Sequence, residues 1–103
     1  MPPEATLGRA LLRTLQDLDA LIPKVSDTQL AELREKRAAL LQSIGDLVET
    51  NLDKASVEYA QATAALDDAS NRIREASANI AKVAQAIAML GKALELAAKL
   101  AAA

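Results

Sequence analysis

Apolar residues recur at helical spacing along the first part of the chain. Their intervals of four, four, three and four residues place the following side chains on one face of a helix: Leu7, Leu11, Leu15, Leu18 and Ile22. Pro23 ends this helix, because its ring cannot donate a backbone hydrogen bond and pushes the preceding residue out of the helical region. The pattern predicts a helix over residues 4–21.

A second helical stretch begins at Asp27, shortly after that proline. Ser26 and Asp27 are typical N-cap residues, and Gln29 stands three residues after Ser26, as in a capping box. From Asp27 to the end of the sequence there is no proline, and the only glycines are Gly45 and Gly91. Helix is therefore expected over nearly all the rest of the chain.

This long stretch carries a heptad repeat from residue 52 onward. Large side chains occupy its a positions, namely Leu52, Tyr59, Leu66, Ile73, Ile80, Ile87 and Leu94. Mostly small side chains occupy the d positions three residues later, namely Ala55, Ala62, Ala69, Ala76, Val83, Leu90 and Ala97, and every e position is small. Such a face suits close antiparallel packing better than a parallel dimeric zipper, which would carry Leu at d and charges at e and g.

An antiparallel pair requires the chain to reverse direction within this stretch. A tip at residues 67–71 is favoured, because the Asp, Ser and Asn side chains there compete with the helix by bonding their own backbone. A break at residues 50–54 is a second solution, and one unbroken helix from Asp27 onward is a third.

The favoured tip predicts helices over residues 27–66 and 71–100. With the helix over residues 4–21 they give an all-α, three-helix bundle in a single domain, residues 1–103. In this fold a long, coiled-coil-like antiparallel hairpin with an Ala-rich seam is braced by the short N-terminal helix.

Composition supports helices and excludes much chemistry. Of 103 residues, 51% are hydrophobic and a single Tyr is the only aromatic side chain, so the core must be built from Leu, Ile, Val and Ala. The absence of Cys and His removes disulfides, thiolate metal sites and the commonest general base. No calcium loop surrounds Asp67, Asp68 and Glu75, which we interpret as a polar turn or solvated face. We therefore expect that the protein is not an enzyme and that it has no catalytic residues, no cofactor and no metal site.

The net charge and the apolar segments of the sequence limit the classes of partner and the location that we expect. A formal net charge of −2 with interspersed signs gives no field that would gather nucleic acid, and no aromatic residues interleave the basic ones. Residues 1–8 lack the basic and apolar regions of a secretory signal, and the apolar run over residues 83–91 is too short to span a membrane. We expect a cytoplasmic protein that binds neither nucleic acid nor a small-molecule substrate.

One segment resembles part of an enzyme family. Residues 30–41, LAELREKRAALL, are similar to the opening helix of the small all-helical chorismate mutases. That resemblance implies an active site that works with arginines and without histidine. The same segment is typical of any amphipathic helix, with Glu32 and Lys36 one turn apart on an exposed, salt-bridged face, and we favour this second interpretation.

Interaction with other helices is the function that the pattern favours. The candidate contact residues are the single aromatic residue and five apolar residues near the end: Tyr59, Ile80, Ile87, Met89, Leu94 and Leu96. A two-helix arm cannot cover both of its faces, so we expect a partner protein, a second copy of the chain in a homodimer, or both. The alternative is an amphipathic protein that coats a lipid or hydrophobic surface, because Lys82, Lys92 and Lys99 interleave the apolar residues.

Overall fold

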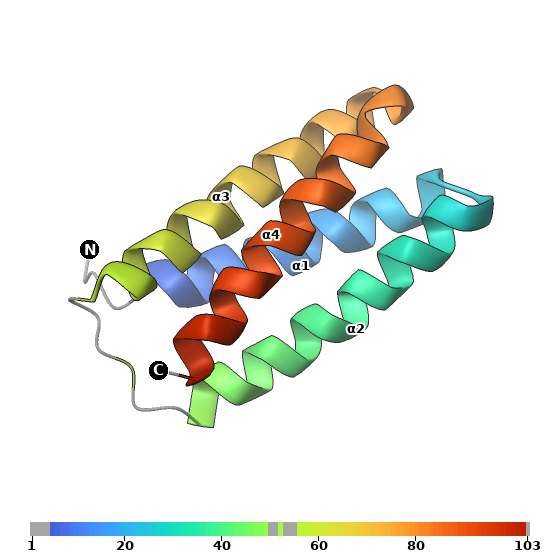
Figure 1. Cartoon of the computed structure of the whole chain (residues 1–103). Coiled ribbons are helices and arrows are strands. Elements are labelled where there is room, and N and C mark those ends of the chain that lie inside the picture. The colour runs from blue at the N-terminus through green and yellow to red at the C-terminus, as the bar shows by residue number, and fades with distance from the viewer. Residues whose placement is uncertain (1–4, 50–51, 53–55, 103) are drawn as a thin grey trace.

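The computed structural model describes residues 5–49, 52 and 56–102, which form helices joined by short turns (Figure 1). The α-helices are α1 (Ala5–Leu21), α2 (Asp27–Glu49), α3 (Val57–Ala78) and α4 (Val83–Ala102). Two short 3-10 helices, η1 (Ile22–Lys24) and η2 (Ile80–Lys82), follow α1 and α3. The predicted all-α class is confirmed, but this part of the chain holds four α-helices rather than three.

The first helix coincides closely with the predicted one. Its apolar stripe faces inward, with Leu7, Leu11 and Leu18 buried. Pro23 lies in η1, where the chain leaves α1. α2 then begins at the predicted residue, Asp27, whose φ of 59° lies in the left-handed region that Asp tolerates better than most residues do.

The predicted tip at residues 67–71 is wrong, because these residues lie inside α3. Ser70, which we expected to bond its own backbone, instead donates its hydroxyl to Asp17 of α1. The chain reverses at Asn79, whose backbone is extended (φ −144°, ψ 100°) and whose side-chain oxygen accepts a hydrogen bond from the Ala81 N–H at 3.2 Å. A single asparagine cap, rather than the Asp-rich cluster, therefore separates α3 from the last helix.

The predicted helix over residues 27–66 is also wrong as a single element. α2 ends at Glu49, and α3 begins at Val57. The Ser56 hydroxyl caps α3 by accepting a hydrogen bond from the Tyr59 N–H at 3.2 Å, which satisfies one of the free amides at the helix start.

One of the other predicted boundaries coincides with a gap between helices, and the remaining predictions are wrong. The alternative break at residues 50–54 falls between α2 and α3, and most of it lies outside the described residues. The helix predicted over residues 71–100 is interrupted at Asn79, and the same reversal excludes one unbroken helix from Asp27 onward.

The helices pack around a shared core in the order α1, α3, α4, α2 (Figure 1). α3 and α4 are antiparallel and make the most extensive contact. α1 runs parallel to α3, with Thr14 beside Leu66 and Asp17 beside Ser70, and α2 runs parallel to α4. α1 and α2 contact each other little, and α2 and α3, although consecutive in the chain, occupy opposite corners of the bundle.

The core follows both rows of the predicted heptad in α3 but only the d row in α4. The d row is buried in both helices: Ala62, Ala69, Ala76, Val83, Leu90 and Ala97. In α3 the second buried row is the predicted a row, Tyr59, Leu66 and Ile73, whereas in α4 it is Ala86, Ala93 and Leu100. Ile80 is 45% exposed, and Ile87 and Leu94 are half-buried instead of central, because α4 turns its d row and the residues three positions after it toward the core. The predicted seam is wrong for these three residues.

Candidate interaction surface

A groove runs along the outer seam between α3 and α4. One part has a volume of about 500 Å³ and is lined by Gln61, Ala64, Ala65, Asp68, Met89, Lys92, Leu96 and Lys99. An adjoining hollow of about 530 Å³ shares Met89 and Lys92 with it and adds Arg72, Gln85 and Ala88. We refer to these residues together as the α3/α4 groove.

Antiparallel packing sets which residues of the two helices lie at the same height in the groove. Because residues 79–82 join α3 to α4, a residue of α3 lies level with the residue of α4 at the same distance from that reversal. Three such pairs are Asp68 with Lys92, Gln61 with Lys99, and Arg72 with Met89. The lining agrees with this order, since each of these pairs shares a hollow.

The floor of the groove is apolar, and the apolar side chains that α3 contributes to it are small. Ala65 is buried, and Met89 and Leu96 are half-buried against the core. Ala64 is exposed beside them. Small side chains on α3 therefore leave part of the two larger side chains of α4 open to solvent.

The rim of the groove is charged. Asp68, Lys92 and Lys99 are exposed, and none of the three makes an ion pair with another described residue. Arg72 Nη1 lies 3.4 Å from Glu75 Oε1, which neutralises part of its charge. The groove thus offers one acidic and two basic groups that have no counter-ion within the described part of the molecule.

The structure brings two of the predicted contact residues together in this groove, Met89 and Leu96. Ile87 and Leu94 lie on the side of α4 opposite to Met89 and Leu96. Gly91 lies on this same side, where the Lys36 side chain of α2 approaches it. Ile80 lies apart from both sets, in η2. The candidate contact residues therefore face different parts of the surface.

Tyr59 is buried at the end of the bundle where α3 begins, in an apolar pocket of about 150 Å³. The pocket is lined by Leu7, Gly8, Leu11, Ile44, Leu47, Val48, Leu52 and Tyr59 itself. It lies where α1 and α2 contact each other little, and Val48 beside it is 79% exposed. Tyr59 packs in the core of this end and is not part of the α3/α4 groove.

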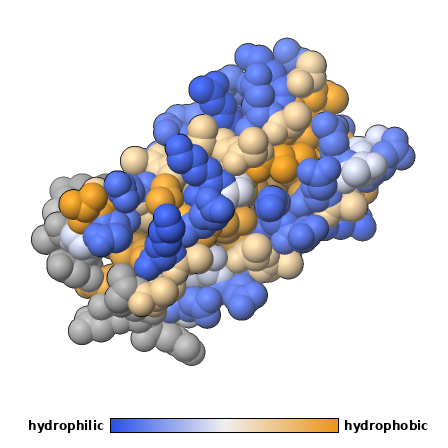
Figure 2. Space-filling view, in the orientation of Figure 1, coloured by the Kyte–Doolittle hydropathy of each residue, from blue (hydrophilic) through white to orange (hydrophobic). Residues whose placement is uncertain are grey.

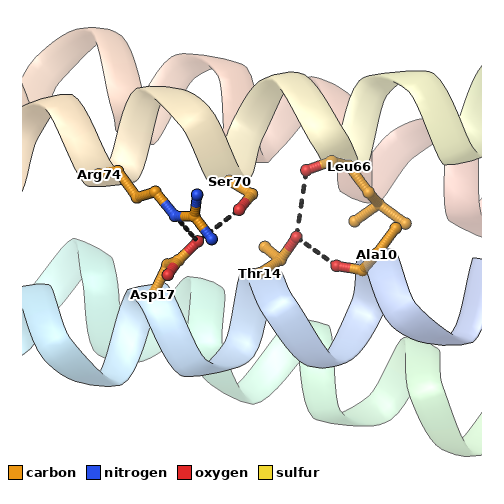
Figure 3. Close-up of polar contacts among 6 residues, drawn as sticks. All are labelled: Ala10, Thr14, Asp17, Leu66, Ser70 and Arg74. Carbon is orange, nitrogen blue, oxygen red and sulfur yellow. Dashed lines mark hydrogen bonds and ion pairs between the residues drawn. The ribbon is translucent and has the colours of Figure 1, made fainter.

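A buried threonine forms a polar contact between α1 and α3 that the sequence did not predict. The Thr14 hydroxyl oxygen lies 2.7 Å from the carbonyl oxygen of Ala10 and 3.1 Å from that of Leu66 (Figure 3). Its single proton is shared between, or alternates between, an acceptor on its own helix and one on the neighbouring helix. The contact ties the two backbones together inside the core.

One turn further along the same seam lies a second polar contact (Figure 3). Ser70 is buried and donates its hydroxyl to the Asp17 carboxylate, to which Arg74 Nε also donates at 3.1 Å. The contact joins the two helices, and we interpret it as fixing the register of α1 against α3. Its members are 53 and 57 positions apart, and no local pattern marks such a pair.

The carboxylates of α3 that we interpreted as a solvated face have separate surroundings. Asp68 lines the groove, Glu75 pairs with Arg72 and with Lys82 at 3.3 Å, and Asp67 is half-buried. Among the described residues no three acidic side chains come together in a way that could hold a metal ion.

The basic residues of the segment that resembles the chorismate mutases also lie apart. Arg37 Nε is 2.6 Å from Asp19 Oδ1 of α1, and the Lys36 side chain lies beside Gly91 of α4. Arg34 is exposed. Their three different surroundings do not support the arginine-based site that the resemblance implies.

Comparison of the chain with protein-family models, with curated proteins and with solved structures gave no match. In the described ranges, no helix has both the length and the apolar character needed to cross a membrane. On the face seen in Figure 2, hydrophobic residues form patches separated by hydrophilic side chains. The α3/α4 groove combines both kinds of surface at one place.

Proposed function

We propose that this protein is a non-enzymatic helical interaction module that binds helices of a partner protein and associates with itself. One observation carries the proposal: the α3/α4 groove leaves Met89 and Leu96 partly exposed between charged residues that lack an ion-pair partner in the described structure. Adaptors, assembly factors and inhibitors of a partner protein all use such a surface.

The physical basis is the burial of apolar area at a site where a helix can approach closely. The alanines of the groove, Ala64, Ala65 and Ala88, present no long side chains to a neighbouring helix. Covering Met89 and Leu96 would remove apolar surface from water, at about 25 cal/mol per Å². An apolar centre with a polar rim is the usual anatomy of a protein–protein interface.

Light scattering over a concentration series tests self-association. The chain has a mass of 10.8 kDa, and we expect the average mass to rise above this value as the protein reaches micromolar concentration. Replacing both Met89 and Leu96 with Ser should lower the association without unfolding the bundle, because both side chains are only half-buried. A mass that stays at 10.8 kDa at the highest concentration would contradict self-association.

One observation favours a second candidate, the coating of a lipid or hydrophobic surface. Lys92 and Lys99 flank Met89 and Leu96 on one side of α4, and a basic rim around apolar residues is typical of helices that lie at a membrane surface. Co-sedimentation with anionic vesicles separates the two candidates. Vesicle binding that Lys92→Glu abolishes would favour the coat, whereas no binding would favour the interaction module.

A further inference from the structure

We infer that the α3/α4 groove receives the same groove of a second copy, about a two-fold axis parallel to the helices, so that Asp68 of each copy faces Lys92 of the other. This inference rests on the proposed function, since it names the surface and the partner of the self-association. The charges along the groove favour a second copy of the chain as its occupant.

The axis direction decides which helices meet. A two-fold rotation about an axis parallel to α3 and α4 places α3 of one copy over α4 of the other, while each residue keeps its height along the bundle. Residues that are level within one copy are therefore opposite each other between copies. The four facing pairs are Gln61 with Lys99, Ala65 with Leu96, Asp68 with Lys92, and Arg72 with Met89.

These pairs are complementary in charge at the height of Asp68 and place no like charges opposite each other at the other heights. Asp68 meets Lys92 twice, once on each side of the axis, and both groups are exposed and without an ion pair in the described structure of one copy. Lys99 and Arg72 each face an uncharged side chain. Ala65 provides the space into which Leu96 of the second copy packs.

The other two-fold arrangement depends on the height of its axis. An axis perpendicular to the helices within the interface would place α3 against α3 and α4 against α4. If it passed at the height of Asp68, Asp68 would face Asp68 and Lys92 would face Lys92, and such like-charge pairs disfavour association. The parallel axis needs no particular height, because every residue keeps its own height and Asp68 faces Lys92 on both sides.

Charge-swapped variants test the pairing directly. Asp68→Lys should place Lys opposite Lys92 on both sides of the axis, and Lys92→Asp should place Asp opposite Asp68. We expect each variant alone to raise the dissociation constant of the dimer by roughly tenfold or more in sedimentation velocity. The two variants mixed in equal amounts should associate with each other, because the facing charges are then opposite at both positions. The double variant Asp68→Lys, Lys92→Asp should associate with itself again.

Matched controls carry the same charge changes outside the groove. Glu35→Lys and Arg34→Asp alter the net charge by the same amounts at exposed positions of α2, and we expect both to associate like the unaltered protein. Far-ultraviolet circular dichroism checks that every variant is helical. Since recovery in the mixture and in the double variant requires folded protein, misfolding cannot imitate the expected pattern.

The outcomes separate this inference from the proposed function. If the unaltered protein associates but the single variants associate equally well, or the mixture does not recover, self-association stands and the pairing is wrong. If the unaltered protein is a monomer at all concentrations, the pairing and the self-association are both wrong, and only the binding of a partner protein is left of the proposed function. If it is a monomer and Lys92→Asp abolishes binding to anionic vesicles, the groove faces lipid and the inference is likewise overturned.

Discussion

At the scale of single residues, the bundle depends on small side chains that let helices approach one another. Ala69 and Ala76 are fully buried on α3, in the row that the heptad predicted to be buried. Alanine positions of this kind have no room for a longer side chain, because protein interiors are packed as densely as organic crystals.

Ala69→Leu and Ala76→Leu should each lower the free energy of unfolding by about 1–3 kcal/mol, because the added atoms push the helices apart. Ala60→Leu and Ala78→Leu, at exposed positions of the same helix outside the groove, should be nearly neutral. Thermal melts monitored by circular dichroism provide the measurement. Equal losses at the buried and the exposed positions would contradict the packing described for α3.

Asp17→Ala should also destabilise the protein, by about 1–3 kcal/mol, because the buried Ser70 hydroxyl loses its charged acceptor. Arg74→Ala should cost less than about 1 kcal/mol, since Arg74 forms an exposed ion pair that water screens. Denaturant titrations compare the two losses. If they are equal, the ion pair and not the buried hydroxyl is the main contribution of Asp17.

The buried d row could be predicted from the sequence because it repeats every seven residues through both α3 and α4. The contacts of Thr14 and Asp17 with α3 could not, since they join positions more than fifty residues apart and involve common polar residue types. Met89 and Leu96 line one groove because they are seven residues apart on the same side of α4. Ile87 was expected in the seam because it occupies an a position of the heptad, whereas the structure leaves it half-buried.

At the scale of elements, the ends of the helices decide the architecture. The sequence predicted α1 and the start of α2 because prolines and capping residues mark them. It misplaced the reversal between α3 and α4, because Asn79 is a weaker signal than the cluster of Asp, Ser and Asn at residues 67–71. The polar side chains of this cluster are at least partly exposed to water or, in the case of Ser70, hydrogen-bonded to α1. These tertiary surroundings outweigh their local preference for a turn.

Proline substitutions distinguish the observed reversal from the predicted tip. Asp68→Pro should cost about 3 kcal/mol or more, because Asp68 lies in the interior of α3, where proline removes a hydrogen bond and clashes with the preceding turn. Ile80→Pro should cost much less. Ile80 is the first residue after the Asn79 cap, where proline is favoured, and the extended backbone of Asn79 is compatible with a following proline.

Helical content and melting temperature, compared between the two proline variants, provide the measurement. A tolerated Asp68→Pro together with a damaging Ile80→Pro would place the reversal back at residues 67–71.

At the scale of the whole molecule, one copy covers most of its own core, which the predicted two-helix arm could not do. α1 and α2 supply the two neighbours that α3 and α4 need. Self-association is therefore not required to bury the core, and its strength is set by the surface of the α3/α4 groove.

The proposed dimer should weaken as salt is added. Asp68 and Lys92 are exposed, so their attraction is screened over a distance of about 8 Å at physiological ionic strength and over about 3 Å at 1 M salt. Sedimentation equilibrium at low and high sodium chloride provides the measurement. Association that strengthens with salt would indicate that apolar contacts dominate, and the charge pairing would then be of little importance.

The parallel packing of α1 on α3 affects the order in which the helix contacts are expected to form during folding. The α3–α4 hairpin is closed by a short turn, so its contacts form at small loss of chain entropy. The contact between Thr14 and Leu66 closes a segment of 52 residues that contains all of α2, and its entropy must be lost before the contact is made. We therefore expect the hairpin to form early and α1 to dock late, so that weakening the polar contacts between α1 and α3 should accelerate unfolding far more than it slows folding.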